Sequence, residues 1–261
     1  VNHVYKTFHP GTINERRALA GVDLHLEEGD FVTVIGGNGA GKSTLLNAVA
    51  GVWPVDGGSI VIDGNDITGL PDYKRAPFIG RVFQDPMMGT APDMQLEENL
   101  ALAYRRGKKL GLRWHINREE RDMYRERLRE LNLGLEDRLT TKVGLLSGGQ
   151  RQAVTLLMAS LQKPRLLLLD EHTAALDPAT AAKVLELSDR IVQENGLTTM
   201  MITHNMKDAI RHGNRLIMMN KGEIIFDCRG EEKAKLTVED LLEKFAQISG
   251  STLDNDRALL G

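Results

Sequence analysis

The segment GGNGAGKST at residues 36–44 constrains the fold more than any other part of the sequence. It follows the apolar run FVTVIG, which predicts a buried strand, and it opens a segment that predicts a helix. The pattern G-x-x-x-x-G-K-[ST] in this context is typical of a phosphate-binding loop, because glycines let backbone N–H groups turn toward phosphate oxygens. We therefore expect nucleotide phosphates to contact Gly36, Gly37, Asn38, Gly39, Ala40, Gly41, Lys42, Ser43 and Thr44.

Side chains from two segments predict the chemistry of this loop. Lys42 can reach the terminal phosphates, and the Ser43 hydroxyl can ligate Mg²⁺. The run LLLLDE predicts a buried strand that delivers Asp170 at its end, where a carboxylate can hold Mg²⁺ directly or through water. Glu171 can orient and polarise the attacking water as a catalytic base, and the alternative for it is a salt-bridged surface glutamate.

A second glycine-rich stretch, LSGGQ at residues 146–150, opens another predicted helix. A helix N-terminus presents unpaired N–H groups and the positive end of a dipole, so it attracts anions. One nucleotide hardly needs two phosphate-binding segments from distant parts of one chain. The role of the second segment is therefore a separate question.

Composition excludes several classes of protein. The 261 residues carry a formal charge of -3, so the overall balance gives no attraction to nucleic acid, and we expect no such partner. One cysteine, Cys228, excludes an internal disulfide and is expected to pack in the core. The longest strongly apolar run, LLLL, is too short to cross a bilayer, so other chains would cross any membrane that the protein serves.

Predicted strands alternate with predicted helices over most of the chain, which indicates an α/β fold with a largely parallel sheet covered on both faces. We expect one domain over residues 1–261. Within it, residues 1–85 and 161–227 form the nucleotide-binding core with a β subdomain, residues 86–160 form an inserted helical subdomain, and residues 228–261 form a C-terminal helical tail whose last dozen residues are loosely held.

Four further segments occur in the order of the ATP-binding-cassette family: Gln84 in VFQDP, LSGGQRQ, DEHTAALD and His204 in ITHN. The chain resembles the nucleotide-binding subunit of a transporter over roughly residues 2–227, nearly the whole domain. The resemblance implies a P-loop NTPase core with a mostly parallel sheet, an N-terminal antiparallel β subdomain and an inserted helical subdomain. It also implies an ATPase that requires ATP and Mg²⁺.

The resemblance implies roles for single residues. Gln84 would sense Mg²⁺ and the attacking water and link the site to the membrane partner, and His204 would contact the γ-phosphate, although a lone His204 could be an ordinary strand-end histidine. Asp177 would lie in the loop that crosses between subunits. Phe8 would stack on adenine, with Tyr5 as the less favoured aromatic and core packing as the alternative for Phe8.

The resemblance also implies an answer for LSGGQ. Ser147, Gly148, Gly149 and Gln150 would close over ATP held by the other subunit, so that two chains in head-to-tail symmetry form two composite sites. The expected partners are a second copy or a paralogous ATPase subunit, an integral membrane permease and a separate solute-binding protein. The chain would then lie peripherally on the cytoplasmic face of the membrane.

Segments DEHTAALD and VGLLSGGQRQA are similar to cassettes associated with uptake of amino acids or related small solutes. Two other functions remain as alternatives. One is a cassette ATPase that acts on DNA or ribosomes, which usually carries zinc modules, coiled-coil inserts or two cassettes per chain. The other is a module that uses ATP only to dimerise, which Glu171 argues against.

Several residues depart from the family pattern or extend it. His172 stands where the family usually has proline, and we favour a structural hydrogen bond for it over tuning of the base. Trp53, where an aliphatic residue is common, is expected to fill the core. Met87 and Met88 suit either a permease helix or the core.

Residues 104–130 contain ten Arg or Lys and five Asp or Glu, the strongest local charge asymmetry of the chain. Its second half is expected to be a solvated helix with charge pairs between successive turns. For the first half, RRGKKLGLRW, we hypothesise contact of Arg105, Arg106, Lys108 and Lys109 with the permease or lipid headgroups.

Overall fold

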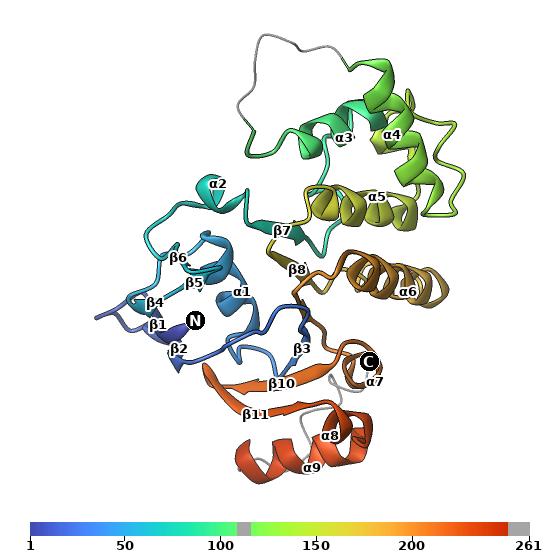
Figure 1. Ribbon diagram of the computed structural model, residues 1–261. Helices are drawn as coiled ribbons and strands as arrows, with labels where there is room; N and C mark the ends of the chain where they lie inside the picture. The colour runs from blue at the N-terminus through green and yellow to red at the C-terminus, as the bar shows by residue number, and fades with distance from the viewer. Residues whose placement is uncertain (109–115, 250–261) are drawn as a thin grey trace. The chain divides into compact units, whose positions relative to one another are not determined.

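The computed structural model describes residues 1–108 and 116–249, which fall into two compact units (Figure 1). The first unit contains the chain up to Arg75 and from Leu197 onward, and the second runs over Ala76–Gly196. Each unit carries its own strands and helices. The expected helical subdomain, residues 86–160, falls inside the second unit, and its exact bounds stay a prediction.

The main sheet of the first unit has the strand order β11, β10, β3, β9. Strand β3 (Phe31–Ile35) lies between β10 (Arg215–Asn220) and β9 (Thr199–Ile202), and it is parallel to both. Strand β11 (Glu223–Arg229) pairs with β10 in the antiparallel sense. All five residues of β3 are buried, as expected for a parallel strand covered on both faces.

Helices from the C-terminal part of the chain pack on this sheet. Helix α7 (Met206–Arg211), the short helix α8 (Glu231–Ala234) and helix α9 (Val238–Ser249) follow β9 and β11. A buried cluster joins α7 and α9 to the strands through Ile35, Met206, Ala209, Leu216, Met218, Cys228, Leu241 and Phe245. Helix α9 starts at a capping box, in which Thr237 and Asp240 exchange backbone and side-chain hydrogen bonds. The final dozen residues lie outside the described ones.

Cys228 belongs to that cluster and is 2% exposed, which confirms its predicted place in the core. Burial raises the pKa of the Cys228 thiol to about 11, because a thiolate loses its hydration there. The thiol is therefore neutral and poorly nucleophilic at physiological pH.

A three-stranded antiparallel sheet confirms the expected N-terminal β subdomain. Strand β1 (Asn2–Phe8) lies between β2 (Arg16–Val22) and β4 (Gly57–Ser59). A short hairpin follows, formed by β5 (Val61–Ile62) and β6 (Asn65–Asp66), and the four-residue helix α2 (Asp72–Arg75) ends this part of the unit.

The C-terminal end of helix α1 (Lys42–Ala50) contacts a buried arginine from α2. The Arg75 side chain is 2% exposed and donates from Nη1 to the carbonyls of Ala48 and Val49, both at 2.8 Å. It also donates to the carbonyls of Leu70 and Thr68 at 2.8 and 2.9 Å. A guanidinium at a helix C-terminus satisfies its last carbonyls and complements the negative end of its dipole.

The described residues of the second unit form two parallel strands and several helices. Strand β7 (Ile79–Val82) pairs with β8 (Leu166–Asp170), whose first four residues are buried. Helices α3 (Leu96–Tyr104) and α4 (Arg118–Arg129) precede the 3₁₀ turn Val143–Leu145, and α5 (Gly148–Ser160) packs against α6 (Pro178–Asn195) and β7. Helix α6 has Asp177 as N-cap, Pro178 in the first turn and Gly196 as C-cap, residues that favour these helix ends.

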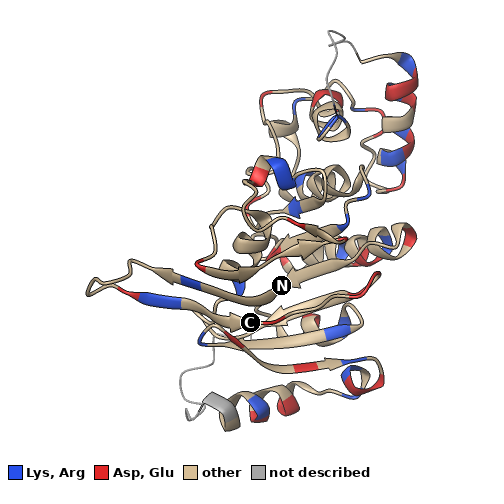
Figure 2. Ribbon diagram, turned by 60° about the vertical axis from the view of Figure 1, so that its left-hand side comes forward, with Lys and Arg blue, Asp and Glu red and all other residues tan. Residues whose placement is uncertain are grey.

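Helix α4 is the solvated, charge-paired helix that the sequence predicts. Figure 2 shows acidic and basic residues interspersed along it. Asp122 pairs with Arg125 at 2.8 Å and with Arg118 at 3.8 Å, and most pairs are three residues apart rather than four. Exposed pairs of this kind contribute little to stability individually.

The hypothesis that the basic segment contacts membrane or permease is wrong for its first two residues. Arg105 donates to both carboxylate oxygens of Glu120 at 3.0 and 2.9 Å. Arg106 donates to the carbonyl of Ala159 at 3.2 Å, and burial lowers its pKa. Both guanidinium groups are therefore used within the unit. The sequence did not reveal these partners, because i, i+4 patterns do not show contacts with other helices. Lys108 lies 3.7 Å from the Tyr104 ring centroid, and Lys109 lies outside the described residues.

Two other expectations concern exposed apolar residues. Trp53 does not fill the core: it is 41% exposed and packs its ring edge-on against Phe8. Met87 and Met88 are 42% and 68% exposed, which excludes core packing for them. Among the residues that the structure describes, no helix is both long and apolar enough to cross a bilayer.

We predict that Arg75→Ala lowers the free energy of unfolding by about 3 kcal/mol, because it leaves buried carbonyls of α1 without donors. Urea unfolding followed by circular dichroism measures the change. Arg118→Ala is the control, because its side chain is 95% exposed and forms one long ion pair, so it should change stability by less than about 0.5 kcal/mol. Equal effects of the two substitutions would contradict the capping role.

Candidate functional site

The phosphate-binding loop joins β3 to α1, as the sequence predicts. Gly36 has a φ of 147°, and a Cβ there would lie 2.2 Å from the carbonyl oxygen of Met219 in β10, so only glycine fits. Lys42 is 8% exposed, and its Nζ donates to the carbonyls of Gly36 and Gly37 at 2.6 and 3.2 Å. The ammonium therefore lies within the loop, where a phosphate would meet positive charge and backbone N–H groups together. Ser43 is exposed beside it.

His204 lies at the same edge of the sheet as this loop. It follows β9, which is paired with β3 in parallel so that Ile202 is opposite Val34. The Thr203 N–H donates to the Val34 carbonyl at 3.2 Å, extending the pairing by one residue. His204 is half-buried, and the next residue, Asn205, caps α7. The structure therefore brings the predicted γ-phosphate contact and the loop together within the first unit.

The first unit also contains the two aromatic residues considered for adenine, Phe8 and Tyr5, and an arginine that contacts the loop, Arg16. Phe8, at the end of β1, is half-buried rather than part of the core, and its ring meets Trp53 at 5.5 Å and 86°. Tyr5 lies within β1, as expected. The Arg16 guanidinium donates to the Gly39 carbonyl at 3.0 Å. Sequence reasoning missed Arg16, because only strand pairing brings β2 to the loop.

In the second unit, Gln84 and the two carboxylates follow neighbouring parallel strands. Val82 of β7 pairs with Leu169 of β8, so Gln84 and Asp170 leave the same edge. Gln84 is exposed, whereas the Asp170 side chain is 17% exposed. The structure therefore brings these predicted residues together within this unit.

Asp170 has a partner that the sequence did not reveal. The Arg81 Nη2 lies 3.1 Å from Oδ2 of Asp170. Arg81 of β7 is opposite Leu168 of β8, two residues before Asp170, so its long side chain reaches diagonally to the carboxylate. Burial raises the pKa of Asp170, the Arg81 guanidinium lowers it, and the neighbouring Glu171 carboxylate raises it again. Arg81 keeps the carboxylate oriented at the strand end.

Oxygen donors at these positions fit Mg²⁺. Asp170 supplies a half-buried carboxylate and Ser43 an exposed hydroxyl, both ligand types that Mg²⁺ accepts. The described residues contain no group of three or more His, Cys, Asp or Glu side chains able to hold a metal.

The backbone after β8 turns sharply at Glu171. This residue has a φ of 46°, and its carbonyl accepts from the Ala174 N–H at 3.0 Å. His172 is 1% exposed and lies 2.9 Å, through Nε2, from the Ser188 hydroxyl of α6. The structural hydrogen bond favoured for His172 is therefore confirmed.

The LSGGQ segment opens α5 as predicted. The Ser147 hydroxyl accepts from the Gln150 N–H at 3.3 Å, and the Gln150 side chain accepts from the Ser147 N–H at 3.1 Å. Gly148 and Gly149 face the start of α6, where a Cβ on Gly149 would lie 2.3 Å from Cγ2 of Thr180. Asp177 accepts from the Thr180 N–H at 3.1 Å, which lowers the pKa of its carboxyl.

Arg151 and Gln152, just after this segment, tie it to its surroundings. Arg151 donates to the carbonyls of Val143, Gly144 and Leu146, and so fixes the turn that leads into α5. Gln152 is fully buried and donates to the Phe83 carbonyl at 3.0 Å, directly before Gln84. Both residues belong to the LSGGQRQ segment, but the sequence did not reveal the carbonyl groups to which they donate.

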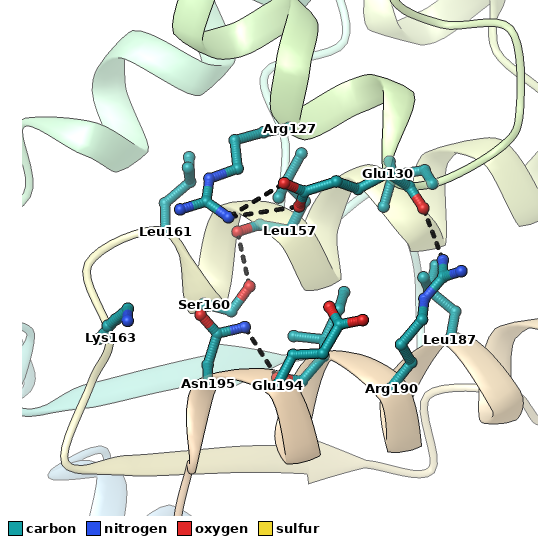
Figure 3. A pocket seen from close by; sticks show the side chains of 12 residues that line it. Arg127, Glu130, Leu157, Ser160, Leu161, Lys163, Leu187, Arg190, Glu194 and Asn195 are labelled. Carbon is teal, nitrogen blue, oxygen red and sulfur yellow. Dashed lines mark hydrogen bonds and ion pairs between the residues drawn. The ribbon is translucent and has the colours of Figure 1, made fainter.

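A hollow between α4, α5 and α6 lies away from all these residues (Figure 3). Its walls carry mainly charged and aliphatic side chains, and none of the predicted site residues lines it. Arg127 pairs with Glu130, and Arg190 donates to the Glu130 carbonyl. These contacts hold the helices of the second unit together and do not form the site.

We predict that Gly149→Ala destabilises the protein by about 2 kcal/mol, because its methyl group overlaps Cγ2 of Thr180. Thr180→Ser removes that methyl group and should recover most of the loss in the double variant. Gly148→Ala is the control, because its Cβ would meet Leu176 at an ordinary 3.4 Å. Urea unfolding measures the parent chain, Gly149→Ala, the double variant and Gly148→Ala. If Thr180→Ser does not restore the stability lost in Gly149→Ala, this packing is contradicted.

Comparison with known proteins identifies the family. Residues 19–174 match the family model described as ABC transporter. The chain is 48% identical, over 90% of its length and 92% of the relative's, to a tyrosine transport ATP-binding protein of Clostridioides difficile. It is 33% identical, over 94% of each chain, to a xylose/arabinose import ATP-binding protein of Sulfolobus acidocaldarius.

A solved ATP-binding cassette, dimeric and in a post-hydrolysis state with ADP and Pi, is 30% identical and superposes with a TM-score of 0.73 over 87% of this chain and 97% of that one. The resemblance and the fold class inferred from the sequence are thus confirmed. The chain belongs to the ABC transporter family, as an ATP-hydrolysing subunit of the import type.

Proposed function

We propose that the chain powers the uptake of amino acids or closely related small solutes through a separate permease. The observation that carries this proposal is the likeness to the tyrosine transport protein, which shares far more of its sequence with this chain than the sugar-import relative does. Identity of this order over nearly the whole of both chains supports a shared solute class more strongly than the cassette fold, which serves many solutes.

Each predicted site residue would have its own role in ATP hydrolysis. The loop from Gly36 to Thr44 binds the phosphates, and Lys42 neutralises their charge. Ser43, Gln84 and Asp170 hold Mg²⁺, which when bound draws charge off the phosphate oxygens. Glu171 orients and polarises the attacking water, and His204 contacts the γ-phosphate. Phe8 stacks on adenine, with Trp53 at its edge.

Two copies would complete each other's sites. The solved cassette with ADP and Pi is dimeric. Ser147, Gly148, Gly149 and Gln150 lie at the start of α5, where free N–H groups and the helix dipole favour a phosphate held by another chain. Asp177 lies close by, at the start of α6, as expected for a loop that meets the second subunit. The second subunit is another copy or a paralogous ATPase.

A membrane permease is the partner that importer function requires. Met87 and Met88 lie three and four residues after Gln84, and these exposed, adaptable side chains suit an apolar helix of the permease. The chain would bind that permease from the cytoplasmic face of the membrane, and a separate solute-binding protein would deliver the solute on the other face. DNA-directed and ribosome-directed functions lose support, because the relatives reported above are transport proteins.

The solute class is tested with the whole transporter. The chain is used to pull its membrane partners from detergent-solubilised membranes, and the complex is returned to vesicles with its solute-binding protein. ATP hydrolysis is then expected to rise several-fold with aromatic amino acids and to stay unchanged with pentoses. Stimulation by pentoses alone would overturn the proposed solute class and leave the ATPase assignment intact.

Glu171→Gln is predicted to lower kcat by at least about a hundredfold, because an amide cannot polarise water as a carboxylate does. It should also shift the protein to an ATP-bound dimer, since nucleotide is bound but not cleaved. Single-turnover hydrolysis and analytical ultracentrifugation in Mg-ATP measure the two effects. Glu194→Gln, an exposed change on α6, is the control. Normal turnover by Glu171→Gln would refute the assignment of the base.

A further inference from the structure

The residue after the proposed base is a buried histidine anchored on a neighbouring helix. His172 is 1% exposed, and Ser188 in the middle of α6 is fully buried. Their Nε2 and Oγ atoms lie 2.9 Å apart. The mechanism proposed above uses neither side chain, so the reason for burying two polar groups beside Glu171 is open.

The Ser188 hydroxyl is placed to bond two groups at once. It lies 2.8 Å from the Val184 carbonyl, one turn earlier in α6, and can donate its single proton there. Its oxygen then accepts from Nε2 of His172 in the tautomer that carries a proton on this nitrogen. The contact ties the imidazole ring to α6.

Glu171 needs such an anchor, because its backbone is in an unfavourable region. Its φ of 46° is left-handed, a conformation that residues other than glycine adopt only where their surroundings enforce it. On one side, Asp170 ends a strand paired with β7. On the other side, His172 is tied to α6.

We propose that His172 is a positioning residue for hydrolysis: its buried hydrogen bond to Ser188 holds the left-handed turn that sets the direction of the Glu171 carboxylate. The proposal rests on the assignment of Glu171 as the base. The His172 ring itself is buried against α6 and would act through the backbone of Glu171. Losing the bond should therefore slow the chemical step and leave ATP binding unchanged.

The test replaces His172 by amide side chains of two lengths and uses a second buried serine, Ser160, as a control for Ser188. Glutamine carries an amide nitrogen at the reach of Nε2, whereas the amide of asparagine stops at the reach of Nδ1. Ser160→Ala is the matched control for Ser188→Ala, because Ser160 is also buried in a helix of the same unit and donates to carbonyls of its own helix. Steady-state kcat and KM for Mg-ATP are measured on the full chain, together with melting temperatures.

Ser188→Ala and His172→Asn are each expected to lower kcat about tenfold with KM for ATP unchanged, since misplacing a catalytic group by about 1 Å costs up to about a hundredfold in rate. His172→Gln should stay within about threefold of the parent chain. The His172→Asn/Ser188→Ala double variant should be no slower than the slower single variant, because both remove the same bond. Ser160→Ala should lower the melting temperature as much as Ser188→Ala while keeping the parent kcat.

If Ser188→Ala matches Ser160→Ala in kcat, or if His172→Gln is as slow as His172→Asn, the positioning role is overturned. Glu171→Gln is measured alongside to separate two failures. Its inactivity together with normal turnover of Ser188→Ala removes only the positioning role. Normal turnover of Glu171→Gln removes the base itself, and with it the proposal that depends on it.

Discussion

Parallel pairing of fully buried strands decides where chemistry can occur in this chain. Because β3 and β9 run in the same direction and are buried, the groups that could meet a ligand lie where the strands end. The phosphate-binding loop and His204 leave one such edge in the first unit. Gln84, Asp170 and Glu171 leave another in the second, after β7 and β8. Each set of residues is positioned by backbone hydrogen bonds between the strands, which aliphatic side chains shield from water.

The polar groups that approach these edges are held by side chains from elsewhere in the fold. Arg81 holds Asp170, Arg16 holds the carbonyl of Gly39, and Ser188 holds His172. Each contact satisfies a group that would otherwise be costly to bury or free to rotate. Rigid support of this kind lets hydrolysis rely on the position of a few groups rather than on their number.

Local signals allowed much of the fold to be predicted. Strand-loop-helix order identified the phosphate-binding loop, and the LSGGQ stretch placed the start of α5. Partners across the fold could not be predicted, since nothing in the spacing of Arg75, Arg81 or Arg105 announces the carbonyls and carboxylates that they meet. Trp53 was misjudged for the same reason, because its apolar ring predicts burial in general and exposure depends on what lies beside it. The catalytic and binding roles of the site residues stay predictions, although the structure places them within their units where such roles require.

The buried thiol of Cys228 has a practical consequence. The chain contains one cysteine, and that cysteine sits in the packed interior with its proton retained. A maleimide dye would therefore find almost no reactive group on the folded protein. A single cysteine introduced on an exposed helix would be the only reactive attachment point, so fluorescence energy transfer between two labelled copies could follow their approach in real time with the native cysteine left in place.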